Sequence, residues 1–381
     1  MSLCFDLSAA AHERAGLGRY AASLARALLD LGVPLAAFLN DPRESHLKPP
    51  LSALPTYTAG LPRKRWRLRA AWSYFGGPDM RRALPGVTVF HATEHLLPVL
   101  PGARSVFTLH DTAYLLFPQH HLLQNRVYLT VMMPRFLARA DRVICVSENT
   151  RRDALRFYRL DPAKVVVIPE GVEPRFQPAD DPARLAELRQ RYGLPERYLL
   201  SVCTLEPRKN LVTLLDAYAA LRARHPGVGL VLAGGKGWLY ESVFDRLRAL
   251  GLENQVVLPG FVPDEDLPAL IRGAAAFAYP SVFEGFGLPP LEAMACGTPV
   301  VVSDASSLPE VVGAAGVLLP PHDPAAWAQA LERVLSDADW RADLSARGLA
   351  RARQFTWEAA ARRTLALYTE LGLRGTPEAG A

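Results

Sequence analysis

The chain has 381 residues, about half of them hydrophobic, a length that predicts two or three domains of roughly 150 residues each. No apolar run approaches the ~20 residues of a membrane-spanning helix, and the N-terminus lacks the basic and apolar regions of a secretory signal. Its four cysteines, at positions 4, 145, 203 and 296, form no metal-binding or paired pattern. We therefore expect a cytoplasmic protein with buried free thiols.

The charge is uneven along the chain. Residues 1–175 carry 23 Lys and Arg against 14 Asp and Glu, whereas the remainder carries 20 against 24, so we expect the first half to meet an anionic partner other than nucleic acid. The densest basic cluster allows two interpretations, a solvated helix face or a patch on the inner face of the plasma membrane with Trp66 at the headgroups. It consists of Arg63, Lys64, Arg65, Trp66, Arg67 and Arg69.

Short apolar runs alternate with helical patterns along the whole chain. Runs rich in Val, Ile, Leu and Phe are typical of parallel strands buried on both faces. In the first half they are 3–8, 87–92, 105–111 and 141–148, with a helical pattern over 19–32. In the second half they are 198–205, 229–235, 255–261, 275–281, 299–304 and 316–321, with helical patterns over 210–225 and 357–372.

The series of strands and helices occurs twice, which predicts two α/β domains, each a doubly wound parallel sheet. The proline-rich and acidic stretch 165–182 marks a linker, so we place the domains at 1–171 and 172–381. The pattern leaves open whether the last helix, about 357–372, stays with its own domain or crosses back to the first. Ligands of such sheets bind at the carboxyl ends of strands, so two facing domains would form a cleft.

The stretch FEGFGLPPLE, residues 283–292, follows the run 275–281. Glu284 is placed at the end of a strand, and Gly285 and Gly287 let the backbone turn and approach a ligand. Pro289 and Pro290 suit a first helical turn, in which we place Glu292. Two carboxylates beside a helix N-terminus suit a ligand rich in hydroxyl groups. A turn followed by a helix-stabilising Glu is the structural alternative.

Three other strand ends carry polar or glycine-rich sequence. In LEPRKN, residues 205–210, Arg208 and Lys209 precede a predicted helix and would suit a diphosphate. In AGLGRY, residues 15–20, Gly16 and Gly18 permit close backbone approach just before a helix. In TLHD, residues 108–111, His110 ends a strand of the first domain and would either contact substrate or cap a turn.

Several motifs point to chemistry that their context does not support. HATEH, residues 91–95, matches a zinc-protease pattern, but it follows a strand-like run rather than lying on a helix. DED, residues 264–266, precedes a predicted helix, where acids are common caps. AGGKGW, residues 233–238, is neither a dinucleotide fingerprint nor a P-loop. We therefore expect no metal site and no cofactor.

Together these stretches resemble the retaining nucleotide-sugar glycosyltransferases of family 4, which have the glycosyltransferase B fold of two Rossmann-like domains facing a cleft. The resemblance covers nearly the whole chain and is strongest over about 195–316. Its most specific element is E-x7-E, here Glu284 and Glu292, accompanied by EPRKN, LAGGKGW and GFVPDEDL. In the first domain GLGRY, TLHD, VSENT and IPEGV fit with more tolerance.

The resemblance implies a role for each matched residue. Arg208 and Lys209 would neutralise the departing diphosphate, and Glu292 would accept hydrogen bonds from ribose. Glu284, with the amides of Gly285, Phe286, Gly287 and Leu288, would hold the donor sugar. From the first domain, Gly16 and Gly18 would reach the phosphates and His110 the sugar. The loop of Phe261, Val262 and Pro263 would face the base.

The resemblance thus predicts a metal-independent, retaining hexosyltransferase of polysaccharide biosynthesis. Its donor is best taken as GDP-mannose, with UDP-glucose open, and its acceptor as a glycan or a lipid-linked glycan. Two rival interpretations use the same fold. One is a nucleotide-sugar 2-epimerase, and the other is a non-catalytic nucleotide-sugar-binding protein.

Overall fold

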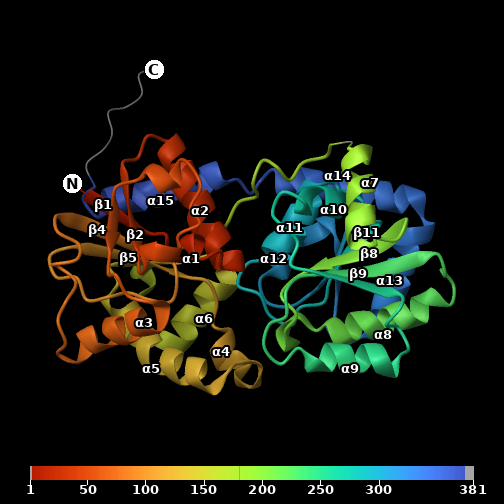
Figure 1. Cartoon of the computed structure of the whole chain (residues 1–381), viewed down its shortest axis with the longest axis horizontal. Helices are drawn as coiled ribbons and strands as arrows, with labels where there is room; N and C mark the ends of the chain where they lie inside the picture. Colours follow the sequence, from red (N-terminus) through yellow and green to blue (C-terminus); the bar gives the residue numbers. More distant parts are fainter. Residues whose placement is uncertain (1, 180, 374–381) are drawn as a thin grey trace. The chain divides into compact units, whose positions relative to one another are not determined.

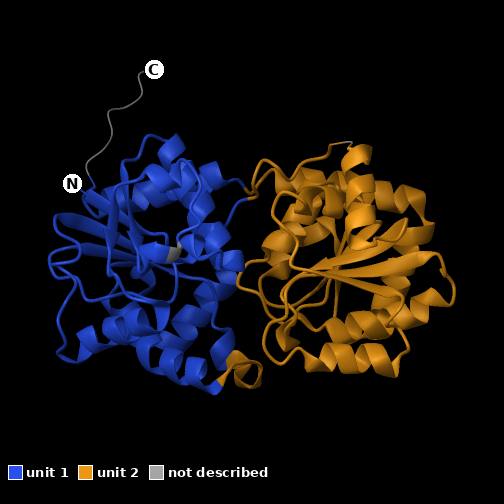
Figure 2. Cartoon of the chain, in the orientation of Figure 1, with its two compact units in different colours: residues 1–115, 123–171, 356–381 blue, residues 116–122, 172–355 orange. Residues whose placement is uncertain are grey.

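The computed structural model describes residues 2–179 and 181–373, and these residues divide into two compact units (Figures 1 and 2). Unit 1 comprises residues 1–115, 123–171 and 356–381, and unit 2 comprises residues 116–122 and 172–355. The chain therefore passes from one unit to the other at Gly171 and Val172. Helix α15 (Trp357–Glu370) packs against α2 (Ala15–Asp30) within unit 1.

Unit 1 is built on a parallel sheet of seven strands in the order β3-β2-β1-β4-β5-β6-β7. The strands are β1 (Ser2–Asp6), β2 (Leu35–Leu39), β3 (Thr56–Thr58), β4 (Val87–Ala92), β5 (Arg104–Leu109), β6 (Arg142–Cys145) and β7 (Val165–Val167). Adjacent strands are in register at pairs such as Leu3 with Leu35 and Phe107 with Val143. Because β7 belongs to this sheet, the predicted linker begins too early, and only the part after Val167 connects the units.

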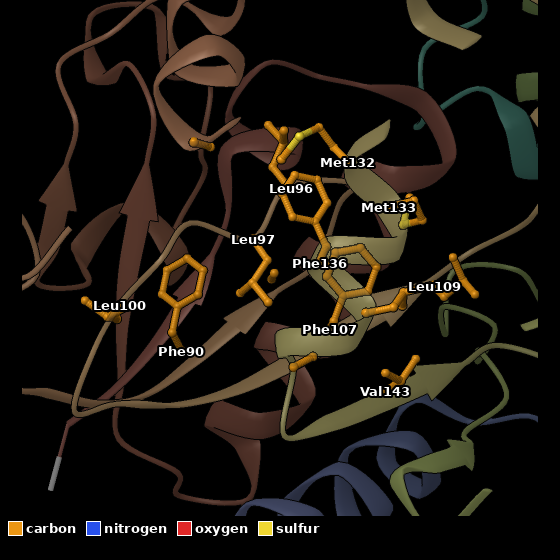
Figure 3. Close-up of a cluster of buried hydrophobic side chains, with 14 of the residues drawn as sticks. Phe90, Leu96, Leu97, Leu100, Phe107, Leu109, Met132, Met133, Phe136 and Val143 are labelled. Atoms are coloured by element: carbon orange, nitrogen blue, oxygen red, sulfur yellow. The ribbon is translucent and has the colours of Figure 1, made fainter. Parts of the chain in front are cut away.

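Helices cover both faces of the first sheet (Figure 1). α1 (Ser8–Ala11), α2 and α15 lie on one face. The other face carries α3 (Arg63–Trp72) with the short turn η3 (Ser73–Phe75), α5 (Leu123–Arg139) and α6 (Glu148–Tyr158), and α4 (Ala113–Leu116) follows β5. The buried side chains of α5, among them Met132, Met133 and Phe136, meet Phe90 and Phe107 of the sheet in one core (Figure 3).

Trp66 of α3 also lies in this core. Its side chain is fully buried, with its ring 5.1 Å from that of Phe38. The sequence-based placement of Trp66 at lipid headgroups is therefore wrong, because an indole packed against the sheet is not available to a surface. The basic residues on either side of it do lie on a helix, and Lys64 and Arg65 are exposed.

Unit 2 is built on a parallel sheet of six strands in the order β10-β9-β8-β11-β12-β13. The strands are β8 (Arg197–Val202), β9 (Val228–Ala233), β10 (Val256–Gly260), β11 (Ala276–Tyr279), β12 (Val300–Ser303) and β13 (Val317–Leu319). Helices cover both faces (Figure 1). They are α7 (Pro182–Tyr192), α8 (Leu211–Arg222), α9 (Glu241–Ala249), α10 (Leu267–Arg272), α11 (Leu288–Ala295), α12 (Leu308–Val312), α13 (Pro324–Ser336) and α14 (Ala338–Ala352).

The predicted fold class is confirmed, because both sheets are wholly parallel and doubly wound. The apolar runs correspond to strands that are buried on both faces, as in β9, where all six residues are buried. Sequence analysis did not identify β2, an all-buried LAAFL segment, or β3, a three-residue strand at the sheet edge. All four cysteines are free thiols, as predicted, and only Cys203 is less than fully buried.

Candidate active site

The polar residues of unit 2 gather where its strand order reverses. Strands β8, β9 and β10 extend to one side, and β11, β12 and β13 to the other, so the carboxyl ends of β8 and β11 form a topological switch point. Loops there diverge and leave room for a ligand. Glu206, Arg208 and Lys209 follow β8, and Glu284 follows β11.

The local sequence explains why Arg208 and Lys209 are held before a helix. They lie in a short 3-10 turn, η6 (Pro207–Lys209), whose first residue is a proline that suits a helical start. Asn210 then takes a left-handed conformation, with φ of 53°, and α8 begins at Leu211. The side-chain amide of Asn210 donates to the carbonyls of Pro280 and Pro321, which fixes the turn against the ends of β11 and β13.

The Glu284 carboxylate forms an ion pair with each of the two cations. The Lys209 ammonium lies 2.6 Å from Glu284 Oε1, and the Arg208 guanidinium lies 3.0 Å from Oε2. Arg208 also pairs with Glu206 at 2.7 Å, and Lys209 donates to the Tyr279 hydroxyl at 3.0 Å. The structure thus brings together three of the predicted residues and adds two, Glu206 and Tyr279, that sequence analysis did not single out.

The pairing fixes the charge of the Glu284 carboxyl. Burial alone would raise its pKa, but Lys209 and Arg208 outweigh burial and lower the pKa to about 2. Glu284 is therefore an anion at any working pH. Because each side chain is largely buried, the charges hold one another in place more firmly than exposed pairs do.

Two serines that precede α12 hold the backbone of the Glu284 loop. Ser306 Oγ accepts from the Glu284 N–H at 2.7 Å, and Ser307 Oγ donates to the carbonyls of Glu284 and Phe286 at 2.9 and 2.6 Å. Gly287 has a φ of 123°, and a Cβ there would lie 2.8 Å from Leu308. Glycine is needed at this position for both reasons. The serines belong to the stretch SDASSLPEVVG, residues 303–313, and sequence analysis did not single them out.

The position of Glu292 differs from the prediction. Helix α11 begins at Leu288, so Glu292 is its fifth residue and lies beyond the first turn, with a fully buried side chain. Pro289 and Pro290 carry no N–H, so at this helix start only residues up to Leu288 can present amides. The predicted amides of residues 285–288 thus belong to the loop before α11 and to its first residue, and their contact with a donor sugar stays a prediction.

The residues 285–288 and Val262 are buried, whereas Phe261 is exposed. The Phe286 ring packs edge-on against Phe355, with centroids 5.8 Å apart. Val262 and Pro263 follow β10, the outer strand of the sheet, rather than the strands that flank the switch point.

A short segment from the first half of the chain belongs to unit 2. Residues 116–122 pack beside the switch point, with the Phe117 ring 5.7 Å from that of Phe283. The indole N–H of Trp238 donates to the His120 carbonyl. Burial and the nearby Arg208 lower the pKa of His120. Sequence analysis missed this segment, because it lies between α4 and α5 and does not directly follow the end of β5.

In unit 1, His110 follows β5 and is enclosed by polar partners. Its Nε2 lies 2.8 Å from the Thr93 carbonyl, and its Nδ1 lies 3.6 Å from Glu170. The Tyr20 ring stacks edge-on against the imidazole, with centroids 4.7 Å apart. Glu170 lies in IPEGV, which the resemblance included, but the pairing with His110 was not foreseen.

The two glycines of AGLGRY serve different purposes. Both lie inside the first turn of α2, which begins at Ala15, and not before the helix as predicted. A Cβ on Gly18 would lie 2.7 Å from the Ala9 carbonyl oxygen, so this glycine allows α1 and α2 to pack closely. Gly16 is exposed and has open space beside it. Of the two, only Gly16 lies at the surface with open space beside its Cα.

The switch point of unit 1, between β1 and β4, carries a group of charges that sequence analysis did not find. Asp6 ends β1 and is fully buried, and Oδ2 has no hydrogen-bond partner among the described residues. Glu94 follows β4 and pairs with Arg14. Burial, reinforced by Glu94, raises the pKa of Asp6 to about 7. Only the β1–β4 pairing, which links residues 85 or 86 positions apart in sequence, places these acids together.

The two apparent metal motifs have other partners. Asp266, fully buried, accepts from Arg184, from Arg191 at 2.9 Å and from Tyr192 at 2.7 Å, so it joins α7 to α10. It stands at the N-cap position but does not cap the helix through its side chain, contrary to expectation. His91 is part of β4 and pairs with Thr108 and with Tyr368 of α15. Nowhere in residues 2–179 and 181–373 do three potential metal ligands gather.

Among the described helices, none combines the length and apolar character that crossing a bilayer requires.

Comparison with known proteins connects both units to one family. Residues 14–176 match the family model Glycosyltransferase Family 4, and residues 186–351 match Glycosyl transferases group 1. The O-antigen chain mannosyltransferase B of Escherichia coli is 36% identical over 285 residues, which cover 74% of this chain and 74% of that protein.

Two further comparisons extend the match. A D-inositol 3-phosphate glycosyltransferase of Salinispora tropica is 39% identical over 249 residues. They cover 61% of this chain and 52%, about half, of that protein. The solved sucrose-phosphate synthase of Thermosynechococcus elongatus has a TM-score of 0.76, with 97% of this chain and 99% of that chain covered. At 24% identity this last likeness shows the fold alone.

Proposed function

This chain belongs to the group 1 glycosyl transferases of family 4, and from that premise we propose that it transfers a mannosyl group from GDP-mannose to a glycan or lipid-linked glycan. Mannose is favoured because a relative named as a mannosyltransferase shares 36% identity over three quarters of both chains. UDP-glucose is the second candidate donor.

One observation carries the mechanism. Arg208 and Lys209 at the end of β8 are both held by Glu284 at the end of β11, within 3.0 Å. A leaving diphosphate needs cations that are already in place, because reorienting charge during the reaction would cost free energy. Glu284, as a permanent anion, keeps the two cations oriented before the donor arrives. Lys209 has two acceptors among the described residues, Glu284 and Tyr279, and its ammonium carries three N–H groups.

We assign the steps as follows. The bond between the anomeric carbon and the diphosphate oxygen breaks, and Arg208 and Lys209 stabilise the charge that develops on that oxygen. The acceptor hydroxyl attacks from the same face, and its proton passes to the departing diphosphate, so configuration is retained. Glu284 holds the sugar and Glu292 the ribose. The roles of His110, Gly16, Gly18 and Val262 toward the donor stay predictions.

Donor identity is tested by thermal unfolding of the whole chain with GDP-mannose, UDP-glucose, GDP and UDP. A ligand at roughly 100 times its Kd adds about 2.7 kcal/mol of stability, so we expect GDP-mannose to raise Tm and the uridine nucleotides to raise it less. A larger shift with UDP-glucose would overturn the choice of mannose and leave the transferase assignment intact.

Chemistry is tested by incubating the protein with GDP-mannose alone. A transferase hydrolyses the donor slowly or leaves it unchanged, whereas a 2-epimerase would convert its sugar. Adding an E. coli lipid extract with its saccharide carriers should then yield a mannosylated product. Conversion of the sugar with no acceptor present would refute transfer as the main activity.

Metal independence is tested by dialysis against EDTA. We expect full activity afterwards, because Arg208 and Lys209 supply the positive charge that a divalent ion would otherwise provide. Asp264→Asn should also keep the rate within a few-fold, since Asp264 is exposed and pairs with Arg175. Asp266 is unsuitable for this test, because its buried contacts are structural. Loss of activity that Mn²⁺ restores would contradict the cation mechanism.

A further inference from the structure

Unit 1 exposes a group of large apolar side chains on two neighbouring helical segments. Leu68 and Trp72 of α3, Phe75 of η3, and Leu123, Val127 and Val131 of α5 form this group, which we call the α3–α5 face. Trp72 and Phe75 are 57% and 59% exposed. Single exposed apolar residues are ordinary, but several gathered on one surface indicate an interaction site.

The spacing in α5 shows that its exposed residues form one stripe. Leu123, Val127 and Val131 are four residues apart, so they lie on the same side of the helix. Met132, Met133 and Phe136 point the other way, into the core (Figure 3). A helix with one buried side is expected to be polar on the other. An apolar outer stripe on α5 therefore needs its own explanation.

Direct contacts join α5 to α3 and η3. Arg67 donates to the Asn125 side chain at 2.9 Å, and its guanidinium lies 4.1 Å from the centre of the Tyr128 ring. The Tyr128 hydroxyl donates to the Arg67 carbonyl at 3.1 Å. Farther along α5, the Arg135 guanidinium lies 5.0 Å from the centre of the Phe75 ring. The apolar residues of the two segments therefore belong to one surface.

The charge around this face is predominantly positive. Residues 45–78 and 112–140, which include both segments, contain no Asp or Glu. Five of the ten residues of α3 are Lys or Arg, and α5 adds Arg126, Arg135 and Arg139. Beside Arg135 and Arg139 the surface is hollowed, over about 610 Å³, with Tyr74 in its wall. The face thus combines apolar side chains with an excess of positive charge.

We propose that the α3–α5 face docks on the surface of an anionic lipid bilayer. The apolar side chains enter the boundary between headgroups and acyl chains, and the cations lie at the level of the lipid phosphates. A second copy of the chain is a poorer occupant, because it would bring two sets of cations together. The proposal replaces Trp66 with Trp72 and Phe75 as the membrane-facing aromatic residues, and it does not depend on the proposed transfer reaction.

The test is sedimentation of the full chain with vesicles of phosphatidylcholine mixed with phosphatidylglycerol, beside vesicles of phosphatidylcholine alone. We expect binding to the anionic vesicles that falls as salt is raised. The double variant Trp72→Ser, Phe75→Ser should weaken binding by about tenfold or more, because two large side chains no longer leave water. Leu239→Ser, which removes an exposed leucine of unit 2, is the matched control and should bind normally.

Charge reversal tests the contribution of the positively charged side chains to membrane binding. Lys64→Glu with Arg126→Glu should reduce binding to anionic vesicles several-fold, while Arg353→Glu, an exposed position in unit 2, should have little effect. In a fluorescence experiment the emission of Trp72 should shift to shorter wavelength on binding. Trp72→Phe should keep most of the binding and lose that shift.

Failure of the unaltered chain to bind anionic vesicles would overturn the proposal. So would vesicle binding that the Trp72→Ser, Phe75→Ser variant retains in full, provided circular dichroism shows that the variant is folded. If the chain instead self-associates through these side chains, as sedimentation velocity with and without the double variant would reveal, the face is a protein interface and the membrane assignment is wrong.

Discussion

Each unit has a buried carboxyl at the equivalent point of its sheet, yet the neighbouring charges shift the pKa values of these two carboxyls in opposite directions. Each site lies at a switch point, between β8 and β11 in unit 2 and between β1 and β4 in unit 1. Glu284 in unit 2 is bracketed by two cations and has a pKa of about 2, whereas Asp6 in unit 1 lies beside Glu94 and has a pKa of about 7.

The difference shows that fold position alone does not determine the chemistry of a site. Both carboxyls are buried, and burial raises the pKa of each. The partners decide the outcome, because Lys209 and Arg208 reverse the effect of burial while Glu94 adds to it. Unit 2 therefore holds a fixed charge suited to orienting cations, and unit 1 holds a carboxyl that titrates near neutral pH.

The largest expected effect comes from removing one of the cations of unit 2. Arg208→Ala should lower kcat on the order of a hundredfold, as loss of one preorganised charge contact typically does. Unit 2 should stay folded, because Glu284 keeps Lys209 at 2.6 Å. Kinetics and Tm would be measured beside Arg248→Ala, an exposed arginine of the same unit. A folded variant with normal kcat would show that Arg208 is only structural.

The second prediction is that the buried carboxyls of the two units make stability depend on pH in opposite directions. The Glu284 pKa falls on folding, so its contribution to stability is present above about pH 4.5 and is lost as pH falls toward 2, with a magnitude on the order of 3 kcal/mol. The Asp6 pKa rises on folding, so stability instead declines as pH rises from about 4 to 7.

Urea unfolding across this pH range checks the direction in which each carboxyl changes the free energy of unfolding. Asp6→Asn should gain stability relative to the unaltered chain above about pH 7, because an amide in that place has no charge to bury. Glu284→Gln should lose stability at neutral pH, because it leaves two buried cations short of an anion. Variants that shift stability equally at every pH would refute the contrast between the two sites.

A smaller effect is expected within unit 2 from Glu292. Glu292→Gln should raise the KM for the donor up to about tenfold with less change in kcat, since an amide offers one acceptor where a carboxylate offers two. Glu241→Gln, an acid in the first turn of α9, provides the comparison. If the KM is unchanged, Glu292 does not bind ribose.

The smallest effect separates the two glycines of unit 1. Gly18→Ala should destabilise the chain by about 1–3 kcal/mol, because its Cβ would press on the Ala9 carbonyl at 2.7 Å. Gly16→Ala should keep or slightly raise Tm, since alanine favours a helix, while the donor KM rises a few-fold. Equal Tm losses would mean that Gly16 also serves packing.

Sequence alone determined the architecture and the principal charged residues of the candidate site in unit 2. Buried parallel strands leave short runs rich in branched apolar residues, so the pattern of β4, β9 and β12 is visible locally. The motifs EPRKN and E-x7-E lie within one strand–turn–helix segment each, and their residues are therefore readable without a fold. The free thiols followed in the same way from wide cysteine spacing.

The tertiary structure decided which side chains meet and with what effect. Trp66 and Trp72 lie six residues apart in one basic helix, and only packing against Phe38 shows that the first is buried and the second exposed. The Asp6–Glu94 and His110–Glu170 pairs join residues at or just after the ends of different strands of the first sheet. Contacts of this kind depend on strand order and burial, which act over distances that a local sequence pattern does not encode.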